Sequence, residues 1–531
     1  MANQNDITQC QDDNPDTQST SDQAKSASTL IDGLSSETGS ASRTDTEGQP
    51  VPSGQLPVSG GNETRSTLIG LPVCCGSDGD AYIKITDRSN AYALRIGSKQ
   101  ANNALRHLAR QSGTRLKTSE LRDINDELIA HAEHVGETCD IYYRIAPIPG
   151  GIELDAGDSS HTRIQVTPGK VETITEGSGT LFHRSVGMRP LPMLAEHGNH
   201  KLLRKYVNTD DPSFALFVAW VCYTLAHAKV PTSNYIILVL HGDQGSGKST
   251  LSRLIQALID PHVVGVQSFP TNKKDLVVAA QHAHVLFFDN MRGVRPSSAD
   301  ILSMASTGGS TTTRRLYTDA DQHVHKLHVA MVLNGIHSFV DQPDLAQRCL
   351  TLYLRPIDEQ NRRSESEFVA QFQADLPQIF RGLLDLIANI LIHIPTVEVT
   401  NPERMFDFVT WLAAMEQVDD VPPGVYQAQY SSVLTESMHD SLMDNSLAAA
   451  VLSFAKDIPN CEWSGSPTEL LKNLNFIVGS TTTYSRDWPN NAIALSKRLR
   501  SLQAGLLRQG IAVTLSRGKE RRITITNMGG H

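Results

Sequence analysis

The sequence predicts a multidomain protein with an α/β core at its centre, and three features of the central region support this prediction. An apolar run at 235–240, rich in residues that favour β-strands, leads directly into a glycine-rich loop. Leu251 to Ile259 then repeat apolar residues at helical spacing. Two further apolar runs, at 285–288 and 329–333, each end in polar residues, as buried strands do when they present side chains at one edge of a sheet.

The N-terminal segment 1–66 differs in composition from the rest of the chain. It contains ten acidic and three basic residues and no aromatic residue, so most of the formal net charge of −10 lies there. Such a segment cannot bury enough apolar surface to offset the entropy of ordering, so we expect a disordered polar tail. An acidic arm that binds a partner is the alternative. The remainder of the 531 residues is nearly neutral, which excludes a globally basic nucleic-acid coat but allows local basic patches.

Cysteine usage and the N-terminus predict a soluble cytoplasmic protein. The seven cysteines are sparse and never form a C-x-x-C pair, so neither a disulfide framework nor a zinc ribbon is indicated. The first residues lack the basic and then apolar order of a signal peptide. The longest apolar stretch, Phe214 to Leu225, is shorter than the roughly 20 residues that span a bilayer, so we expect no membrane partner.

Changes in pattern divide the rest of the chain into four parts. Residues 67–205 mix a helical pattern with short alternating runs separated by Pro and Gly, which predicts a small α+β accessory domain without a catalytic pattern. Residues 206–395 form the predicted α/β domain and residues 396–465 a helical region. Residues 466–531 form a separate C-terminal module.

The loop that follows the first apolar run carries the most specific motif of the chain. It reads G-x-x-x-x-G-K-S between a predicted strand and a predicted helix, which is the pattern of a phosphate-binding P-loop. Backbone N–H groups of such a loop surround phosphates, Lys248 would reach the β- and γ-phosphates, and Ser249 would ligate Mg²⁺. ATP and Mg²⁺ are therefore the predicted cofactors. The predicted cofactor-binding residues are Gly242, Asp243, Gln244, Gly245, Ser246, Gly247, Lys248, Ser249 and Thr250.

The polar ends of the two later runs supply further catalytic candidates. Asp289 follows the run at 285–288, as expected for a Walker B aspartate that holds Mg²⁺. Asn290 stands where many ATPases place a catalytic Glu; its amide can orient water but cannot accept a proton, so any general base must be another group. Asn334 follows the run at 329–333, where its amide can hydrogen-bond the attacking water, the sensor 1 role of AAA+ ATPases.

Arg348 is the last catalytic candidate. It stands just before another apolar run, at the place where an AAA+ subunit offers an arginine finger to its neighbour's nucleotide. The alternative is a surface residue at the end of a helix. Arg348 follows the P-loop, Asp289 and Asn334 in the order in which these four elements occur in AAA+ ATPases, and this order favours the arginine finger.

Four short motifs add to this pattern: Gly308-Gly309, Arg314 to Asp319, Leu333 to Ile336 and Asp344 to Arg348. With them the sequence resembles the ATPase module of phage and mobile-element replication proteins, which are related to superfamily 3 and poxvirus-type primase-helicases. The resemblance runs from about Tyr143 to Thr526. It implies an AAA+-like P-loop NTPase that forms a homo-oligomeric ring, such as a hexamer, and acts on DNA as a helicase. No primase domain with recognisable catalytic acids precedes the ATPase, so a separate primase or replication protein is an expected partner.

Residues 311–327 read as a β-hairpin between the two strand ends. In the resembling helicases a hairpin at this place projects into the ring channel and touches the DNA backbone, and an exposed polar hairpin is the alternative. Arg314 and Arg315 could instead face nucleotide at a subunit boundary. A zinc site on His323, His325 and His328 would lack a convincing fourth ligand, so we reject it. The candidate DNA contacts here are Arg314, Arg315, His323, His325 and Lys326.

The C-terminal module predicts a winged helix. Ser466-Pro467-Thr468-Glu469 is a capping box that begins one helix, a second helix covers about 492–509, and 511–526 alternate as a hairpin. Basic residues concentrate here in an otherwise neutral body, which favours DNA contact over a charged helix used for ring assembly. The candidate DNA contacts are Lys497, Arg498, Arg500, Arg517, Lys519, Arg521 and Arg522.

The complete prediction is therefore an AAA+-like α/β P-loop NTPase core with an N-terminal α+β domain, a C-terminal helical region, a winged helix and a disordered N-terminal tail. The predicted function is a DNA-dependent ATPase and ring-forming replicative helicase of a phage or integrated mobile element, with single-stranded or forked DNA as partner. An ATP-gated DNA-binding loader or regulator that remodels a partner without unwinding DNA is the alternative. A small-molecule kinase would need an acceptor pocket and a lid, and would not explain the C-terminal module.

Overall fold

The computed structural model describes residues 60–86, 90–270, 272–291, 293–314, 322–335, 340, 342–357, 364–458, 461–485, 488–516 and 521–528. Most of the predicted tail, residues 1–59, lies outside the described residues. The chain divides into two compact units: unit 1 ends at Val186 and unit 2 contains everything after it. Residues 145–153 and 165–172 belong to unit 2, so the division differs from the predicted boundary at residue 205.

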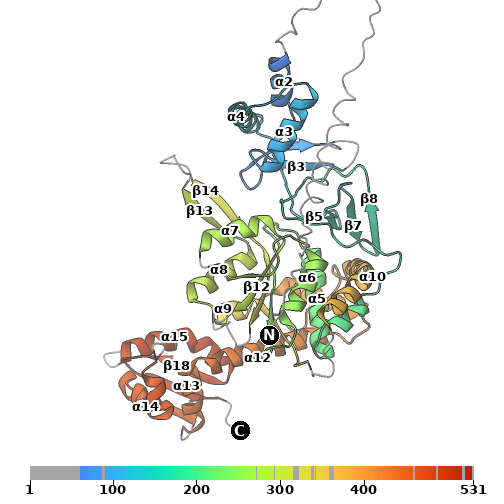
Figure 1. Ribbon diagram of the computed structural model, residues 1–531. Helices are drawn as coiled ribbons and strands as arrows, with labels where there is room; N and C mark the ends of the chain where they lie inside the picture. Colours follow the sequence, from blue (N-terminus) through green and yellow to red (C-terminus); the bar gives the residue numbers. More distant parts are fainter. Residues whose placement is uncertain are drawn as a thin grey trace, which may run out of the picture. The chain divides into compact units, whose positions relative to one another are not determined.

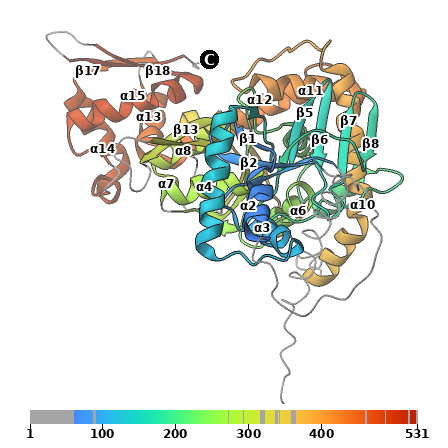
Figure 2. The same ribbon diagram turned by 90° about the horizontal axis from the view of Figure 1, so that it is seen from above.

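Unit 1 is built on a five-stranded sheet of order β4-β1-β2-β3-β9. The central pairs β1–β2 and β2–β3 are antiparallel, and the edge strands β4 and β9 pair in parallel. Figures 1 and 2 show α2, α3 and α4 gathered beside strands β1 and β2. These elements are α2 (Gly60–Ile69), β1 (Val73–Gly76), β2 (Ala81–Ile85), β3 (Tyr92–Arg95), α3 (Lys99–Gln111), α4 (Thr118–Val135), β4 (Thr138–Cys139) and β9 (Phe182–His183).

The core of unit 1 lies between the sheet and these helices. Val73, Ile83 and Leu94 of the strands are buried in one cluster with Leu105 of α3 and Leu128 of α4. The alternation of strand residues and the helical spacing of apolar residues therefore meet on one face of the sheet. The predicted mixture of helix and short strands is confirmed for this part of the chain.

Helix α2 begins inside the predicted tail. Thr64 and Leu68 are only 4% and 2% exposed, and the Thr64 hydroxyl shares a 2.9 Å hydrogen bond with the hydroxyl of Thr114. The predicted boundary at residue 66 is therefore too late. Thr64 lies inside the predicted tail and Leu68 one helical turn later, just beyond its predicted end, and an average over residues 1–66 does not detect a single buried threonine.

A four-stranded sheet of order β5-β6-β7-β8 and a short 3₁₀ helix come next in the chain. The strands are β5 (Ile145–Ile148), β6 (Gly151–Asp155), β7 (Arg163–Thr167) and β8 (Lys170–Ile174), and the 3₁₀ helix is η2 (His200–Tyr206). Helix α5 (Asp211–Ala226) follows, with the Asp210 side chain as its N-cap and Pro212 in its first turn. Leu216 to Ala226 are all buried, so this helix is apolar on every side, as its sequence predicts.

The centre of unit 2 is a parallel five-stranded sheet of order β11-β12-β15-β10-β16. Every pair in it is parallel, so the carboxyl ends of the strands meet at one edge. The α/β class predicted for this region is confirmed. The strands are β10 (Ile237–His241), β11 (Gln267–Ser268), β12 (Val285–Met291), β15 (Ala330–Gly335) and β16 (Cys349–Tyr353).

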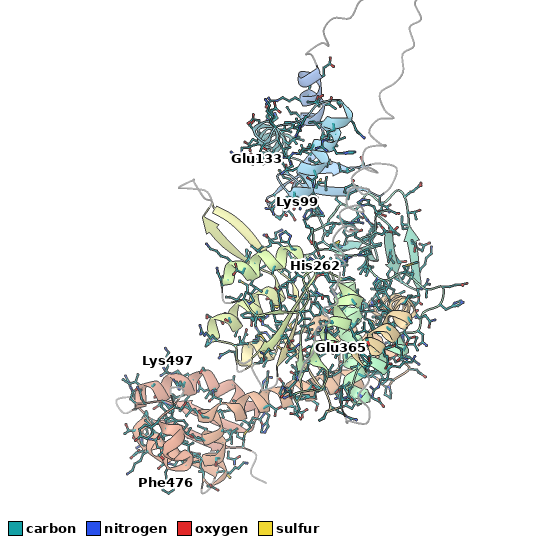
Figure 3. The ribbon with its side chains drawn as sticks, in the orientation of Figure 1. Lys99, Glu133, His262, Glu365, Phe476 and Lys497 are labelled. Atoms are coloured by element: carbon teal, nitrogen blue, oxygen red, sulfur yellow. The ribbon has the colours of Figure 1, made fainter. Side chains whose placement is uncertain are left out.

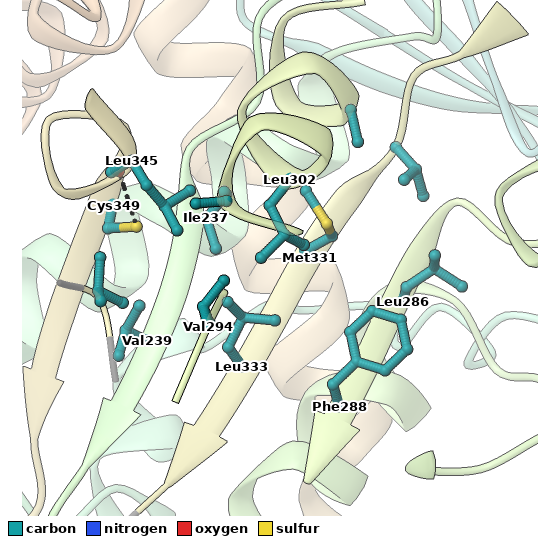
Figure 4. Close-up of a cluster of buried hydrophobic side chains, with 14 of the residues drawn as sticks. Ile237, Val239, Leu286, Phe288, Val294, Leu302, Met331, Leu333, Leu345 and Cys349 are labelled. Atoms are coloured by element: carbon teal, nitrogen blue, oxygen red, sulfur yellow. Dashed lines mark hydrogen bonds between the residues drawn. The ribbon is translucent and has the colours of Figure 1, made fainter. Parts of the chain in front are cut away.

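Helices cover both faces of this sheet. Figure 1 shows α7 and α8 on one side of β12 and α5 and α6 on the other. On the first side, alternate strand residues such as Val239, Phe288 and Leu333 pack against Leu302 of α8 and Leu345 of α9 (Figure 4). These helices are α6 (Lys248–Ile259), α7 (Lys273–His282), α8 (Pro296–Thr307) and α9 (Pro343–Ala346).

The predicted hairpin is confirmed at the level of the backbone. Strands β13 (Gly309–Arg314) and β14 (Gln322–Leu327) pair antiparallel, with Gly309 opposite Leu327 and Arg314 opposite Gln322. The hairpin follows α8 directly and leads through His328 and Val329 into β15. It therefore connects two elements of the parallel sheet's core.

The C-terminal part contains three long helices and a small module. The helices are α10 (Glu365–His393), α11 (Phe406–Val418) and α12 (Val425–Asp444). The module has a three-stranded antiparallel sheet of order β17-β19-β18 packed on three helices around one apolar cluster. Its elements are α13 (Ser446–Lys456), β17 (Glu462–Gly465), α14 (Pro467–Thr483), α15 (Ala492–Arg508), β18 (Ile511–Leu515) and β19 (Ile523–Asn527).

The capping box of α14 forms as predicted. Ser466 Oγ accepts from the Glu469 backbone N–H, and Glu469 Oε2 accepts from the Ser466 N–H. The helix runs further than the predicted end near residue 474, because helical structure resumes beyond a non-helical residue, Gly479, at φ 73° and ψ 178°. Among helices of the described residues, none has the length and apolar character needed to cross a membrane.

Candidate functional site

The glycine-rich loop joins the end of β10 to the start of α6, in the strand–loop–helix order that the sequence predicts. Gly245 and Gly247 adopt φ values of 82° and 86°, a left-handed conformation that residues with a Cβ rarely adopt. A Cβ on Gly242 would lie 2.6 Å from the carbonyl oxygen of Leu354. The tight path of the loop therefore requires glycine at these positions.

Lys248 is held against the inner side of the loop. Its Nζ donates to the carbonyl oxygens of Gly242 and Asp243, each at 2.8 Å. The residue as a whole is only 9% exposed. Burial lowers the pKa of Lys248, while the nearby carboxylates of Asp243 and Asp289 act in the opposite direction. Nζ also donates a longer bond, 3.4 Å, to Ser246 Oγ. An ammonium group that has lost much of its hydration and has only uncharged oxygen partners is well placed to exchange them for a stronger anionic partner.

Ser249 and Asp289 meet at the carboxyl edge of the sheet. Ser249 Oγ, in the first turn of α6, donates a 2.7 Å hydrogen bond to Asp289 Oδ2 at the end of β12. Hydroxyl and carboxylate oxygens are the ligands that Mg²⁺ prefers. Two residues that are 40 positions apart in sequence and were predicted to share one metal ion are thus adjacent.

Asn290 and Asn334 lie at the same edge. The backbone N–H of Asn290 donates to Asp289 Oδ1 at 2.6 Å and to Asn334 Oδ1 at 3.0 Å. Asn290 is exposed and has φ 57°, and it lies where the pairing of β12 with β15 shifts register. Left-handed conformations outside glycine are most readily adopted by asparagine and often occur at functional sites.

Ser252 completes this set, and the sequence interpretation did not include it. Asn334 is fully buried, and its Nδ2 donates to Ser252 Oγ at 3.2 Å. Ser252 lies one turn after Ser249 on α6 and is itself 1% exposed. The sequence could have indicated Ser252, because it is a small polar residue on the buried face of that helix, three positions after a proposed metal ligand. The amide of Asn334 therefore has a fixed orientation.

Arg348 does not lie with these residues. It precedes β16, whose first residue is in register with Ile237 at the start of β10, and its carbonyl accepts from the Ile237 N–H. The loop follows the other end of β10, about 13 Å away at the rise of an extended strand. The side chain of Arg348 is 13% exposed and pairs with Asp344 at 3.4 Å. Arg348 therefore cannot act on a nucleotide bound at its own chain's loop.

The candidate DNA contacts of the hairpin are described only in part. Lys326 is exposed on β14. Arg314, His323 and His325 stand at positions of the hairpin strands where only the backbone is described, and Arg315 lies outside the described residues. No group of three or more metal-binding side chains occurs among the described residues.

The candidate contacts of the C-terminal module lie on α15 and at the hairpin. Lys497 and Arg500 are exposed on α15, whereas Arg498 is half-buried. Arg521 and Arg522 are exposed at the start of β19, and Arg517 and Lys519 lie outside the described residues. Figure 3 shows Lys497 on one side of the module and Phe476, which is 91% exposed, on the opposite side.

Helix α12 connects the sheet to this module. On one side, the Tyr353 hydroxyl of β16 donates to Asp440 Oδ2 at 2.8 Å, and the ring of His241, the last residue of β10, packs edge-on against Tyr353 at 5.2 Å. On the other side, His439 shares a 3.0 Å hydrogen bond with Gln509 at the end of α15. A small cavity between β16 and α12 is lined by Val239, His241, Val340, Thr351, Tyr353, Ser437 and Asp440.

Comparison with known structures finds several distant similarities. The apo structure of the NrS-1 C-terminal region is 12% identical, covers 88% of this chain and 99% of that chain, and has a TM-score of 0.37. A second NrS-1 C-terminal structure, of residues 305–718 in its own chain, has a TM-score of 0.34 at the same identity. A crystal structure of JCV helicase with a bound compound is 14% identical, covers 43% of this chain and 66% of that chain, and has a TM-score of 0.20. A comparison with curated proteins finds no match.

Two family models match the chain. Residues 200–436, which include the parallel sheet, match a model described as actinomycete integrative conjugative element replication protein. Residues 447–530, the C-terminal module, match a model described as the AICE RepA C-terminal domain. By these two matches the chain is a replication protein of a mobile element, similar over both segments to those of actinomycete integrative conjugative elements.

Proposed function

We propose that this replication protein is a DNA-dependent ATPase that assembles as a ring and unwinds DNA. The observation that carries the proposal is the convergence of Lys248, Ser249, Asp289 and Asn334 at the carboxyl edge of one parallel sheet. Ligands of open parallel sheets bind outside the carboxyl ends of the strands. A loop of backbone N–H groups beside a lysine and a hydroxyl–carboxylate pair suits a magnesium–nucleoside triphosphate.

The residues of the site fit ATP and Mg²⁺ in distinct roles. Mg²⁺ neutralises charge on the phosphates, and Ser249 and Asp289 supply the hard oxygen ligands for it. Lys248 would replace its carbonyl partners with phosphate oxygens. Asn334, held by Ser252, would present its amide toward the γ-phosphate side, and Asn290 would orient a water molecule. The proton acceptor for that water is a group other than Asn290.

Arg348 supports assembly into a ring. Because it lies at the amino edge of the sheet, it could serve only a nucleotide held by a neighbouring subunit. An arginine supplied in this way stabilises charge in the transition state of phosphoryl transfer. The site would then be incomplete in a single chain.

The C-terminal module supports DNA as the partner. Three helices and a three-stranded sheet with a basic turn between β18 and β19 have the element order of a winged helix, which we propose for it. Lys497 and Arg500 on α15 would contact DNA in a groove, and the basic residues around the turn would contact phosphates.

Replacement of the loop lysine tests the proposed chemistry. Lys248→Ala should lower DNA-stimulated phosphate release from ATP by about 10²–10³-fold or more, because it removes a cation from the phosphates. DNA affinity without nucleotide should remain unchanged. Lys273→Ala, which removes an exposed lysine at the start of α7, is the matched control and should keep full activity. Undiminished hydrolysis by Lys248→Ala would contradict the assignment.

A strand-displacement assay separates the helicase from the loader. A forked duplex with one labelled strand should be unwound in the presence of Mg²⁺ and ATP, and not with Lys248→Ala. DNA-stimulated hydrolysis without strand displacement would favour an ATP-gated loader or regulator instead.

A further inference from the structure

Unit 1 lies outside both family matches, and one of its helices has an unusual charge distribution. Residues 88–119 contain seven basic residues and no acidic residue, in a chain whose overall charge is negative. Helix α3 occupies the centre of this segment. If these positive charges served to hold unit 1 together by ion pairs, they would be paired with carboxylates nearby.

Most of these charges are not paired. Arg95 forms an ion pair with Asp80 at 2.8 Å. The other described basic residues of the segment form no ion pair with described residues, and four of them are exposed, Arg106 being half-buried. We call these five residues the α3 basic face: Lys99, Arg106, Arg110, Arg115 and Lys117.

The α3 basic face follows from the amphipathic pattern of the helix. Ala101, Ala104, Leu105 and Ala109 face the core of unit 1. Residues 99, 103, 106 and 110 are spaced by three and four positions and so lie on the opposite side of the helix. This side carries Lys99, Asn103, Arg106 and Arg110 over a length of about 16 Å. Arg115 and Lys117 extend it into the connection to α4.

The neighbouring helix α4 has the opposite charge, but much of that charge is already used. Glu127 is paired with Arg65, and the Glu120 carboxylate caps the helix through the Lys117 N–H. Asp123, Asp126 and Glu133 remain exposed on α4. Figure 3 labels Lys99 on α3 and Glu133 on α4. The two signs are therefore separated onto different helices, and the positive side is the less compensated.

We propose that the α3 basic face binds the phosphate backbone of DNA. Phosphates repeat every few ångströms along a strand, so a row of cations about 16 Å long can neutralise two or three of them. Three of the five cations are arginines, whose planar guanidinium groups suit bidentate contacts with phosphate oxygens. The nearby helix α4 offers only scattered and partly neutralised carboxylates, whereas DNA offers a continuous row of negative charge. This contact would be additional to the one proposed for the C-terminal module.

Two sites on one chain would change how the protein holds DNA. When one site is bound, the other meets the same molecule at a high local concentration, so overall affinity exceeds that of either site. Unit 1 would then act as a second grip on DNA instead of a passive accessory domain. This inference depends on DNA as the partner but not on ATP hydrolysis.

The test compares two double variants of the full chain. Arg106→Ala/Arg110→Ala removes two cations of the α3 basic face, and Arg65→Ala/Arg122→Ala removes two arginines from elsewhere in the same unit as the matched control. Affinity for a labelled 30-nucleotide single strand and a labelled 30-base-pair duplex is measured without nucleotide at several KCl concentrations. The slope of log affinity against log salt should fall by about 1.8 for duplex or about 1.4 for the single strand.

The result on the two probes identifies the preferred form of DNA, and the control should leave both slopes unchanged. Arg106→Lys/Arg110→Lys keeps both positive charges and should therefore keep the salt slope of the unchanged protein, whereas a role in packing would not follow charge. Arg115→Glu/Lys117→Glu, in the connection after α3, provides a second route if the helix variant does not fold. The α3 variants should lose the same DNA affinity in a Lys248→Ala background, and this result would show that the DNA contact does not depend on the proposed ATPase. Equal slopes for all variants, or an effect on self-association with unchanged DNA affinity, would overturn the proposal.

Discussion

Ser249 Oγ donates a 2.7 Å hydrogen bond to Asp289 Oδ2, which joins the first turn of α6 to the end of β12. The bond places both oxygen groups next to each other beside the loop. If a metal ion binds here, as proposed, it meets oxygen groups that are already adjacent, so less ordering entropy opposes its binding.

Asp289→Asn should separate nucleotide binding from turnover. The amide oxygen can still accept from Ser249, so the local fold should persist, but the negative charge that we propose holds Mg²⁺ is lost. ATP turnover should fall by about 10²–10³-fold. Turnover at increasing MgCl₂ is the measurement, and Asp300→Asn on the exposed side of α8 is the control. Normal turnover at low Mg²⁺ would show that Asp289 is not a metal ligand.

Asn334→Ala should affect both stability and turnover. The substitution leaves the Asn290 N–H without its amide acceptor and Ser252 Oγ without its donor. Loss of partners for buried polar groups costs about 1–3 kcal/mol, which thermal or urea unfolding would detect. Phosphate release should fall as well, and Asn334→Asp should recover stability better than turnover. Full turnover by a destabilised Asn334→Ala protein would limit this residue to a structural role.

Arg348→Ala should bind ATP but fail to hydrolyse it. Because Arg348 lies at the far edge of the sheet from its own loop, mixing this variant with Lys248→Ala should restore some activity. An equal mixture creates complete sites at about one interface in four, so about a quarter of normal activity is the expected maximum. Lack of recovery, together with lower stability, would assign Arg348 to its pair with Asp344.

Acidification should destabilise the central sheet through His328. Burial lowers the pKa of His328 from 6.5 to about 4, and the charge of Lys229 acts in the same direction. Burial also lowers the pKa of Lys229 to about 7, so this lysine gains charge as the pH falls. Between pH 4 and 6.5 the unfolded chain binds more protons at position 328 than the folded chain does, so stability falls as the pH is lowered through this window.

Urea unfolding at pH 7.5 and pH 5.0 measures this dependence. His328→Gln removes the titrating group and should reduce the loss of stability between the two pH values. His439→Gln, which changes an exposed histidine on α12, is the control and should not. An unchanged loss in His328→Gln would assign the effect to other groups.

Lys497→Ala/Arg500→Ala should weaken DNA binding by the C-terminal module. Both side chains are exposed on α15, so their removal should not disturb the apolar cluster beneath them. The salt dependence for duplex DNA should decrease by about 1.8 if both contact phosphates. Lys472→Ala on α14 removes an exposed lysine from another helix as a control. Combination with Arg106→Ala/Arg110→Ala should be additive if the two DNA contacts are independent.

Local pattern was sufficient for the elements that surround the loop. The apolar run at 235–240 and the helical spacing from Leu251 to Ile259 depend on neighbours in sequence, and a strand at Ile237–His241 and a helix at Lys248–Ile259 form there. The same holds for the capping box at Ser466 and for the hairpin strands. The start of α2 and the full length of α14 were missed, because polar residues and Gly479 obscure the pattern at those ends.

The candidate site required the tertiary structure. Strand order is set by packing between segments far apart in the chain, and it places β15 between β10 and β12. Only that order brings Asn334 to the Asn290 N–H and to Ser252. The position of Arg348 was easier to predict, because the sequence already places it just before an apolar run, and the parallel pairing of β16 with β10 puts it at the other end of the strands from the loop.

The sequence by itself determined which residue types stand at the loop and where the chain can turn tightly. Glycine at 245 and 247, lysine at 248 and the oxygen-bearing side chains at 249 and 289 are local features of residue type and conformation. The tertiary structure decided which of these groups meet, which lie at opposite edges and which charges remain exposed, as on α3. Those outcomes depend on long-range packing, because burial of apolar faces fixes the position of every polar group attached to them.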